Sequence, residues 1–135
     1  MSAETFTAAD WIFDTLNADE DLAGKVHHLI APARATPPYV VYQEQSGIDV
    51  ATANGSRIMA NLLYLVRVIS AGRSLESIKA LANTVDELLQ RASGSNASGE
   101  VISCTREGQT TRAYTASTGE YREIVFTFRL FAQGA

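Results

Sequence analysis

The segment from Ile58 to Ser70 constrains the fold most, because as a β-strand it would present apolar side chains on both of its faces. The two faces carry different sets of side chains, with Leu62, Tyr64, Val66 and Val68 on one and Leu63, Leu65, Arg67 and Ile69 on the other. A period of two residues is typical of a β-strand. A strand that is apolar on both faces is covered twice, either by its own chain or by a neighbouring copy.

A strongly amphipathic helix is predicted directly after this strand. From Leu75 to Ala92, apolar residues recur at helical spacing, and Ser74 is placed to cap the first turn. Gly94 supplies a left-handed end. An earlier helix is predicted to start at Thr7 and to end near Asn17 or Ala18.

Further strands follow from runs of β-branched and aromatic residues. They are a brief one at Val26–Ile30, one at Tyr39–Gln45, and a hairpin of Glu100–Arg106 with Tyr121–Phe131. The predicted fold class is therefore α+β with two layers. It has a mainly antiparallel, four- to five-stranded sheet, with an N-terminal helix and one long amphipathic helix packed on one face. A length of 135 residues fits a single domain, 1–135.

Two polar stretches interrupt this regular pattern. Ser46–Arg57 and Glu107–Glu120 are rich in Gly, Ser, Thr and Asn or Arg, and they are too long for tight turns. We expect long loops at 46–57 and 107–120. Loops of this length tend to carry function.

Charge argues against tight nucleic-acid binding. Eleven basic and fifteen acidic side chains give a net charge of −4, the wrong sign for gripping phosphates. Residues 1–21 hold six acids and no base, which either steers one copy onto another or is a solvated acidic surface. The hydrophobic fraction of 46% predicts a folded chain.

Few residues suggest chemistry. His27 and His28 are adjacent, so a strand would point them to opposite faces, and Cys104 is the single cysteine. No spacing indicates an acid–base pair, a metal site or a cofactor loop, so we expect no enzyme, no metal, no cofactor and no small-molecule substrate. The first residues do not resemble a signal peptide and no run could span a bilayer, which predicts a chain that is cytosolic when made and has no membrane partner.

The order of elements resembles the tail terminator and tail completion (tail-to-head joining) proteins of long-tailed bacteriophages, over nearly the whole chain. The resemblance is carried by Ala31-Pro32, by Pro37-Pro38-Tyr39-Val40-Val41, by the apolar strand around Tyr64–Ile69 that runs into the helix at Ser74, and by the ending Tyr121–Phe131. It implies a virion neck or tail protein that forms a hexameric ring, caps the tail tube and meets the head connector. DNA would pass through that ring without specific binding.

On this reading the two polar stretches would contact a neighbouring copy or the tube. The candidate interface residues are Gly47, Ile48, Asp49, Asn54, Arg57, Arg106, Arg112 and Tyr114. Terminator, joining protein and other neck component stay open as alternatives, as do ring size and tail type. A small nucleic-acid-binding α+β module, using Tyr114, Tyr121 and Arg122, is the second hypothesis. An enzyme using His27, His28, Cys104 and Asp49 is the third.

Overall fold

The computed structural model describes residues 3–32, 34–51, 53, 57–71, 76–117 and 119–134. The elements in chain order are α1 (Ala3–Asn17), β1 (Val26–His28), β2 (Tyr39–Ala51), β3 (Arg57–Ala71), α2 (Glu76–Leu89), β4 (Gly94–Asn96), β5 (Gly99–Ala116) and β6 (Gly119–Gly134). The predicted strand at 58–70 and the pairing of the last two long strands are confirmed.

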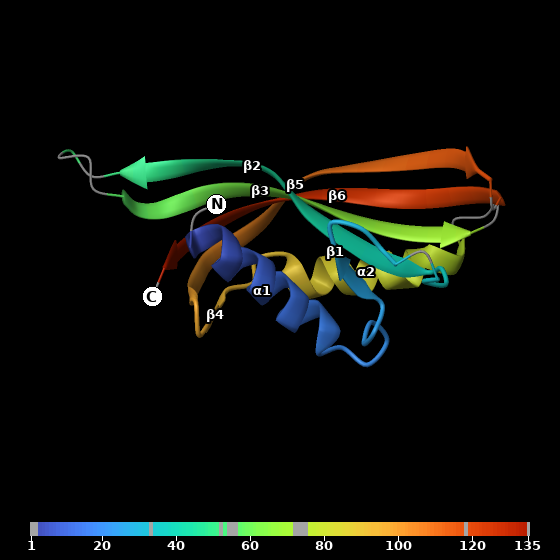
Figure 1. Ribbon diagram of the computed structural model, residues 1–135, viewed down its shortest axis with the longest axis horizontal. Coiled ribbons are helices and arrows are strands. Elements are labelled where there is room, and N and C mark those ends of the chain that lie inside the picture. The colour runs from blue at the N-terminus through green and yellow to red at the C-terminus, as the bar shows by residue number, and fades with distance from the viewer. Residues whose placement is uncertain are drawn as a thin grey trace.

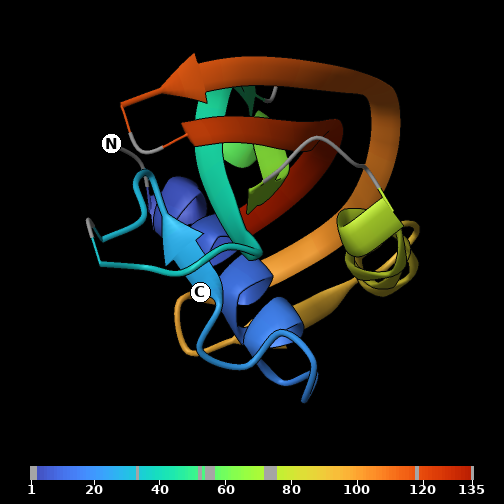
Figure 2. The same ribbon diagram turned by 90° about the vertical axis from the view of Figure 1, so that its right-hand side faces the viewer.

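The predicted fold class was wrong in the number and direction of the strands. The six strands form one mixed sheet in the order β1-β2-β3-β6-β5-β4. β1 runs parallel to β2, and all other pairs are antiparallel. Figure 2 shows the sheet curled into half a barrel. Two short helices accompany it, instead of one long helix packed with an N-terminal one on a flat layer.

One face of the sheet, which we call the helix face, carries the core. Its residues in the two central strands are Leu62, Tyr64, Val66, Phe126, Phe128 and Leu130, all buried. They pack with buried residues of both helices, such as Ile12, Leu16 and Val85. α1 and α2 lie together on this side of the sheet (Figure 1). The opposite, open face includes Leu63 and Leu65, which are only half-buried.

The helices differ from prediction at their ends. α1 begins at Ala3, so Thr7 lies inside it, where its hydroxyl donates to the Ser98 carbonyl at 2.9 Å instead of capping the helix. Arg91, with φ of 62°, takes the left-handed position after α2 that was expected of Gly94. Gly94 instead opens β4 against Trp11, whose Nε1 would lie 2.7 Å from an added Cβ. The predicted cap at Ser74 lies outside the described residues. Neither described helix is long and apolar enough to cross a membrane.

The two stretches expected to be long loops are mostly strand. β2 continues to Ala51 and β3 starts at Arg57, so most of the first stretch is a hairpin. β5 continues to Ala116 and β6 starts at Gly119, which makes the second stretch a hairpin with a short turn. The expectation of loops failed because polar residues on a strand exposed on both faces show no alternation.

Candidate functional site

Two hairpin arms lie at opposite ends of the long axis (Figure 1). The β2–β3 arm comprises residues 43–51 and 57–63, and the β5–β6 arm comprises residues 107–116 and 119–127. The candidate interface residues divide between them, with Gly47, Ile48, Asp49 and Arg57 on the first arm and Arg112 and Tyr114 on the second. Asn54 lies outside the described residues. The structure therefore separates these candidates into two surfaces.

The β2–β3 arm exposes an apolar side chain. Ile48 is 69% exposed, and β2 residues 45–49 are all exposed. Gly47 lies opposite Leu62, and a Cβ added at Gly47 would approach the Leu62 Cδ2 to 2.8 Å. Because Leu62 is 1% exposed, it has little room to move away. A larger residue at position 47 would therefore force the end of the Leu62 side chain to shift within the core.

The β5–β6 arm is anchored by a buried carboxylate that the sequence analysis did not identify. Glu123 of β6 is fully buried on the open face. Its Oε1 accepts a hydrogen bond from the Arg112 Nε of β5, and its Oε2 lies 3.6 Å from the Arg67 Nη1 of β3. The alternation of side chains along β6 indicates the face on which Glu123 lies. Only the sheet register shows that Arg67 and Arg112, from two other strands, lie beside it. A buried charge needs such partners, so Glu123 joins three strands at the base of the arm.

Tyrosines surround the outer part of this arm. The rings of Tyr114 and Tyr121 stack with centroids 5.4 Å apart. Together with Tyr39 and the loop around Pro37, they line a hollow of about 280 Å³. Burial raises the pKa of Tyr39 and of Tyr114, so both phenols stay neutral at physiological pH. Because the hollow brings Tyr114 and Tyr121 of the arm close to Tyr39, the arm bends back toward the start of β2 and closes the half-barrel at this end (Figure 2).

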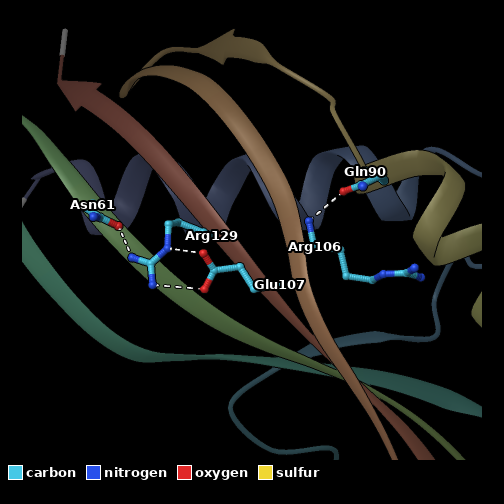
Figure 3. Close-up of polar contacts among 5 residues, drawn as sticks. All are labelled: Asn61, Gln90, Arg106, Glu107 and Arg129. Carbon is cyan, nitrogen blue, oxygen red and sulfur yellow. Dashed lines mark hydrogen bonds and ion pairs between the residues drawn. The ribbon is translucent and has the colours of Figure 1, made fainter.

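A second ion pair joins the sheet where β5 bulges. The irregularity between Arg106 and Gly108 lies beside Glu107, which binds Arg129 of β6 through two hydrogen bonds, of 2.6 and 3.1 Å. Arg129 also donates to the Asn61 side chain of β3 (Figure 3). The hydrogen bond from Arg129 lowers the pKa of Glu107. This contact holds the bulge in place on the open face.

Arg106 faces α2 and not the end of the arm. Its Nη1 lies 3.1 Å from the Asp86 Oδ1, and its guanidinium lies 5.8 Å from the centre of the Phe126 ring. Its backbone N–H donates to the Gln90 side chain at 2.6 Å (Figure 3). These contacts attach β5 to the helix layer, so an interface role for Arg106 stays a prediction.

The residues that suggested chemistry do not converge. Cys104 is buried in the core, and burial raises the pKa of its thiol to about 12, so the thiolate needed by a nucleophile is scarce at neutral pH. His27 and His28 belong to β1, which three strands separate from β5. His27 packs edge-on against Tyr39, and His28 stacks on Tyr42. A Cys104–histidine pair is therefore not formed.

The fold is shared with a chain of a solved virion structure. A chain in the solved structure "Virion of native gene transfer agent (GTA) particle" is 19% identical, with a TM-score of 0.80 over 99% of this chain and 100% of that chain. The family model Tail completion protein gp17 matches residues 11–132. The chain therefore belongs to the Tail completion protein gp17 family, bacteriophage structural proteins of the virion tail or neck. No curated protein matches the sequence significantly.

Proposed function

We propose that the chain, acting as one domain over residues 1–135, forms a homo-oligomeric ring that caps the tail tube and joins it to the head connector. The observation that carries this proposal is the pair of hairpin arms at opposite ends of one sheet (Figure 1). A subunit between tube and connector needs contact surfaces in opposite directions as well as toward its neighbours. The arms supply such surfaces while the helix face remains buried in the subunit itself.

Exposed apolar groups support contacts made by these arms. Ile48 is 69% exposed on the first arm and Tyr114 is 41% exposed on the second. Apolar area of this kind stabilises a contact when a partner covers it. The half-buried Leu63 and Leu65 of the open face add to the surface available for a partner.

The charges on the sheet support a conduit that lets DNA slide. Arg67 and Arg112 are bound to Glu123, and Arg129 is bound to Glu107. These guanidinium groups are partly neutralised before any phosphate approaches. We expect the ring to retain no duplex DNA at physiological salt, which a gel-shift measurement checks.

Ring assembly is tested by replacing Ile48. The purified protein, alone and with its tail tube and connector proteins, is examined by light scattering and negative-stain microscopy. Because burial of one isoleucine contributes about 1.5–3 kcal/mol, we expect Ile48→Asp to raise the concentration needed for assembly by roughly tenfold or more. Ala97→Asp, which adds the same charge to an exposed turn, is the control. A protein that stays monomeric with both partners present contradicts the proposal.

A further inference from the structure

Each arm has a strand edge with no strand beside it in the described part of the chain. β1 pairs with Val40, Val41 and Tyr42 only, so β2 has a neighbour on one side alone from residue 43 to 51. We call this the β2 edge. β4 pairs with residues 99–101 of β5 only.

The second edge is shortened by the end of α2. Arg91 N–H donates to the Cys104 carbonyl at 2.8 Å, and the Gln90 side chain accepts from the Arg106 N–H. β5 therefore has a neighbour on one side alone from residue 108 to 116, within the described residues. We call this the β5 edge. The β5 edge begins just past a bulge, whereas the β2 edge contains one between Glu44 and Ser46 and a second irregularity at Ala51. Between these points both edges run in regular register with the inner strand.

These edges lack two common protections against pairing with another chain. A single-sided strand presents a row of backbone donors and acceptors that a further strand can use, and proteins often block such rows with proline or lysine. The sequences of residues 43–51 and 108–116 contain neither. The β2 and β5 edges are thus suited to accept a strand.

The direction of the strands selects the partner. β2 and β5 lie toward opposite sides of the sheet, and the antiparallel order between them makes them run in opposite directions. Through the register Gln43 is level with Gly108, so the two edges run from this level toward opposite ends of the sheet. A second copy in the same orientation brings its β2 edge antiparallel to the first copy's β5 edge when it is also displaced along the strands, so that its β2–β3 arm overlaps the first copy's β5–β6 arm. Such a head-to-tail contact uses two different surfaces, and it closes into a ring when the rotation between successive copies allows it.

Charge and apolar groups agree with this pairing. The β2 edge contains Glu44 and Asp49 and no base. The β5 edge contains no acid and one base, Arg112, which binds Glu123 of its own copy and keeps 57% of its side chain exposed. The large exposed apolar groups of the two edges, Ile48 and Tyr114, both belong to the open face, because their register partners lie on that face of β3 and β6. In a continued sheet they remain on one face, where cross-strand contacts stabilise the pair.

We infer that neighbouring copies join by backbone pairing between the β2 edge of one copy and the β5 edge of the next, which makes one continuous sheet around the oligomer. This inference rests on the proposed function, since it names the surfaces through which copies in the ring meet. It fixes the contact as copy to copy, through main-chain hydrogen bonds, and leaves the tips of the arms for the tube and connector.

Disulfide trapping tests the pairing. In a Cys104→Ala background, Ile48→Cys is combined with Thr110→Cys or Tyr114→Cys, which lie on the same face of the sheet. Opposed residues of antiparallel strands lie about 4.5–5.5 Å apart at Cα, within the range that a disulfide spans. After oxidation of the assembled protein we expect at least one combination to give a ladder of covalent multimers. The matched control combines Ile48→Cys with Thr111→Cys, which lies on the helix face. It should give roughly tenfold less covalent multimer.

Hydrogen exchange gives an independent readout that needs no substitution. On assembly, amides within residues 43–51 and 108–116 should exchange roughly tenfold or more slowly, because new backbone hydrogen bonds protect them. Rings that form without this protection and without the ladder overturn the inference and leave the proposed function standing. Covalent dimers from Ile48→Cys alone also overturn it, since they indicate a β2-to-β2 contact. Absence of rings under all conditions contradicts the proposed function itself.

Discussion

The two hairpin arms are built from the same element and stabilised in different ways. The β5–β6 arm is held at its base by Glu123 between Arg67 and Arg112, and again by the pair of Glu107 with Arg129. The β2–β3 arm accepts one hydrogen bond from Arg129 at Asn61, and beside Gly47 the space for a side chain is filled by Leu62. One arm is positioned by charge and the other by close packing.

This difference indicates that each arm should respond to a different perturbation. Ion pairs inside the sheet depend on every partner being present, because a carboxylate or guanidinium left alone in a buried site is costly. Close packing depends on volume and is indifferent to charge. Substitutions that change only charge or only volume therefore separate the two arms.

The largest effect is expected at the charged arm. Glu123→Gln keeps the side-chain volume but leaves Arg67 and Arg112 facing a neutral amide in a buried position. The variant loses the charge-assisted hydrogen bond from Arg112, and both arginines are partly exposed and can be solvated, so we expect a loss of about 2–3 kcal/mol. Urea unfolding measures the change. Glu100→Gln, at an exposed position of β5, is the control and should be near neutral. Equal stability of the two variants would show that the buried contact does not anchor this arm.

An intermediate effect is expected at the packed arm. Gly47→Ala places a Cβ 2.8 Å from the Leu62 Cδ2, whereas Gly108→Ala meets no atom within 4 Å. Overpacking of this kind costs about 1–3 kcal/mol, so the Gly47 variant should be less stable by about that amount. Thermal or urea unfolding of the matched pair checks it. If the Gly108 variant is the less stable one, the steric account of the β2–β3 arm is wrong.

The smallest effect is expected at the exposed pair on the bulge. The hydrogen bond from Arg129 lowers the pKa of Glu107, so its ionised form is favoured by folding. That stabilisation is present above the unfolded pKa of the carboxyl and is lost as pH falls through the folded one. Glu107→Gln should therefore lower stability slightly at pH 7 and lose its effect at low pH. A difference that persists unchanged at pH 2 would assign the effect to something other than this ionisation.

The spacing of apolar residues predicted the elements that have one buried face and one exposed face. The strand predicted at 121–131 alternates because one face packs on the helices, and the second helix shows its stripe for the same reason. The strand at 58–70 was predicted from its apolar residues on both faces, of which the helix face is buried while Leu63 and Leu65 on the other are half-buried. The arms show no apolar–polar alternation, because the residues of β2 and β5 in the arms are mostly exposed to solvent on both faces. The parallel pairing of β1 with β2 is a long-range contact without a local pattern.

The candidate site was predicted only in outline. The sequence singled out these stretches because their length and polarity were unusual, and the structure shows that they are hairpin arms and not loops. It did not identify Glu123, whose burial depends on Arg67 and Arg112 arriving from two other strands. It placed Arg106 with the arm residues, whereas the contact with Asp86 ties that side chain to α2. Interface roles for the remaining candidates stay predictions.

The pairing of β3 with β6 has a consequence for synthesis. The middle of the sheet joins residues 60–71 to residues 121–132, with α2, β4 and β5 between them in the chain. Contacts between segments so far apart in sequence form late, because the intervening chain must be closed first. A ribosome-bound chain that lacks β6 has no central partner for β3, so a subunit fit to associate exists only once translation has reached the last strand.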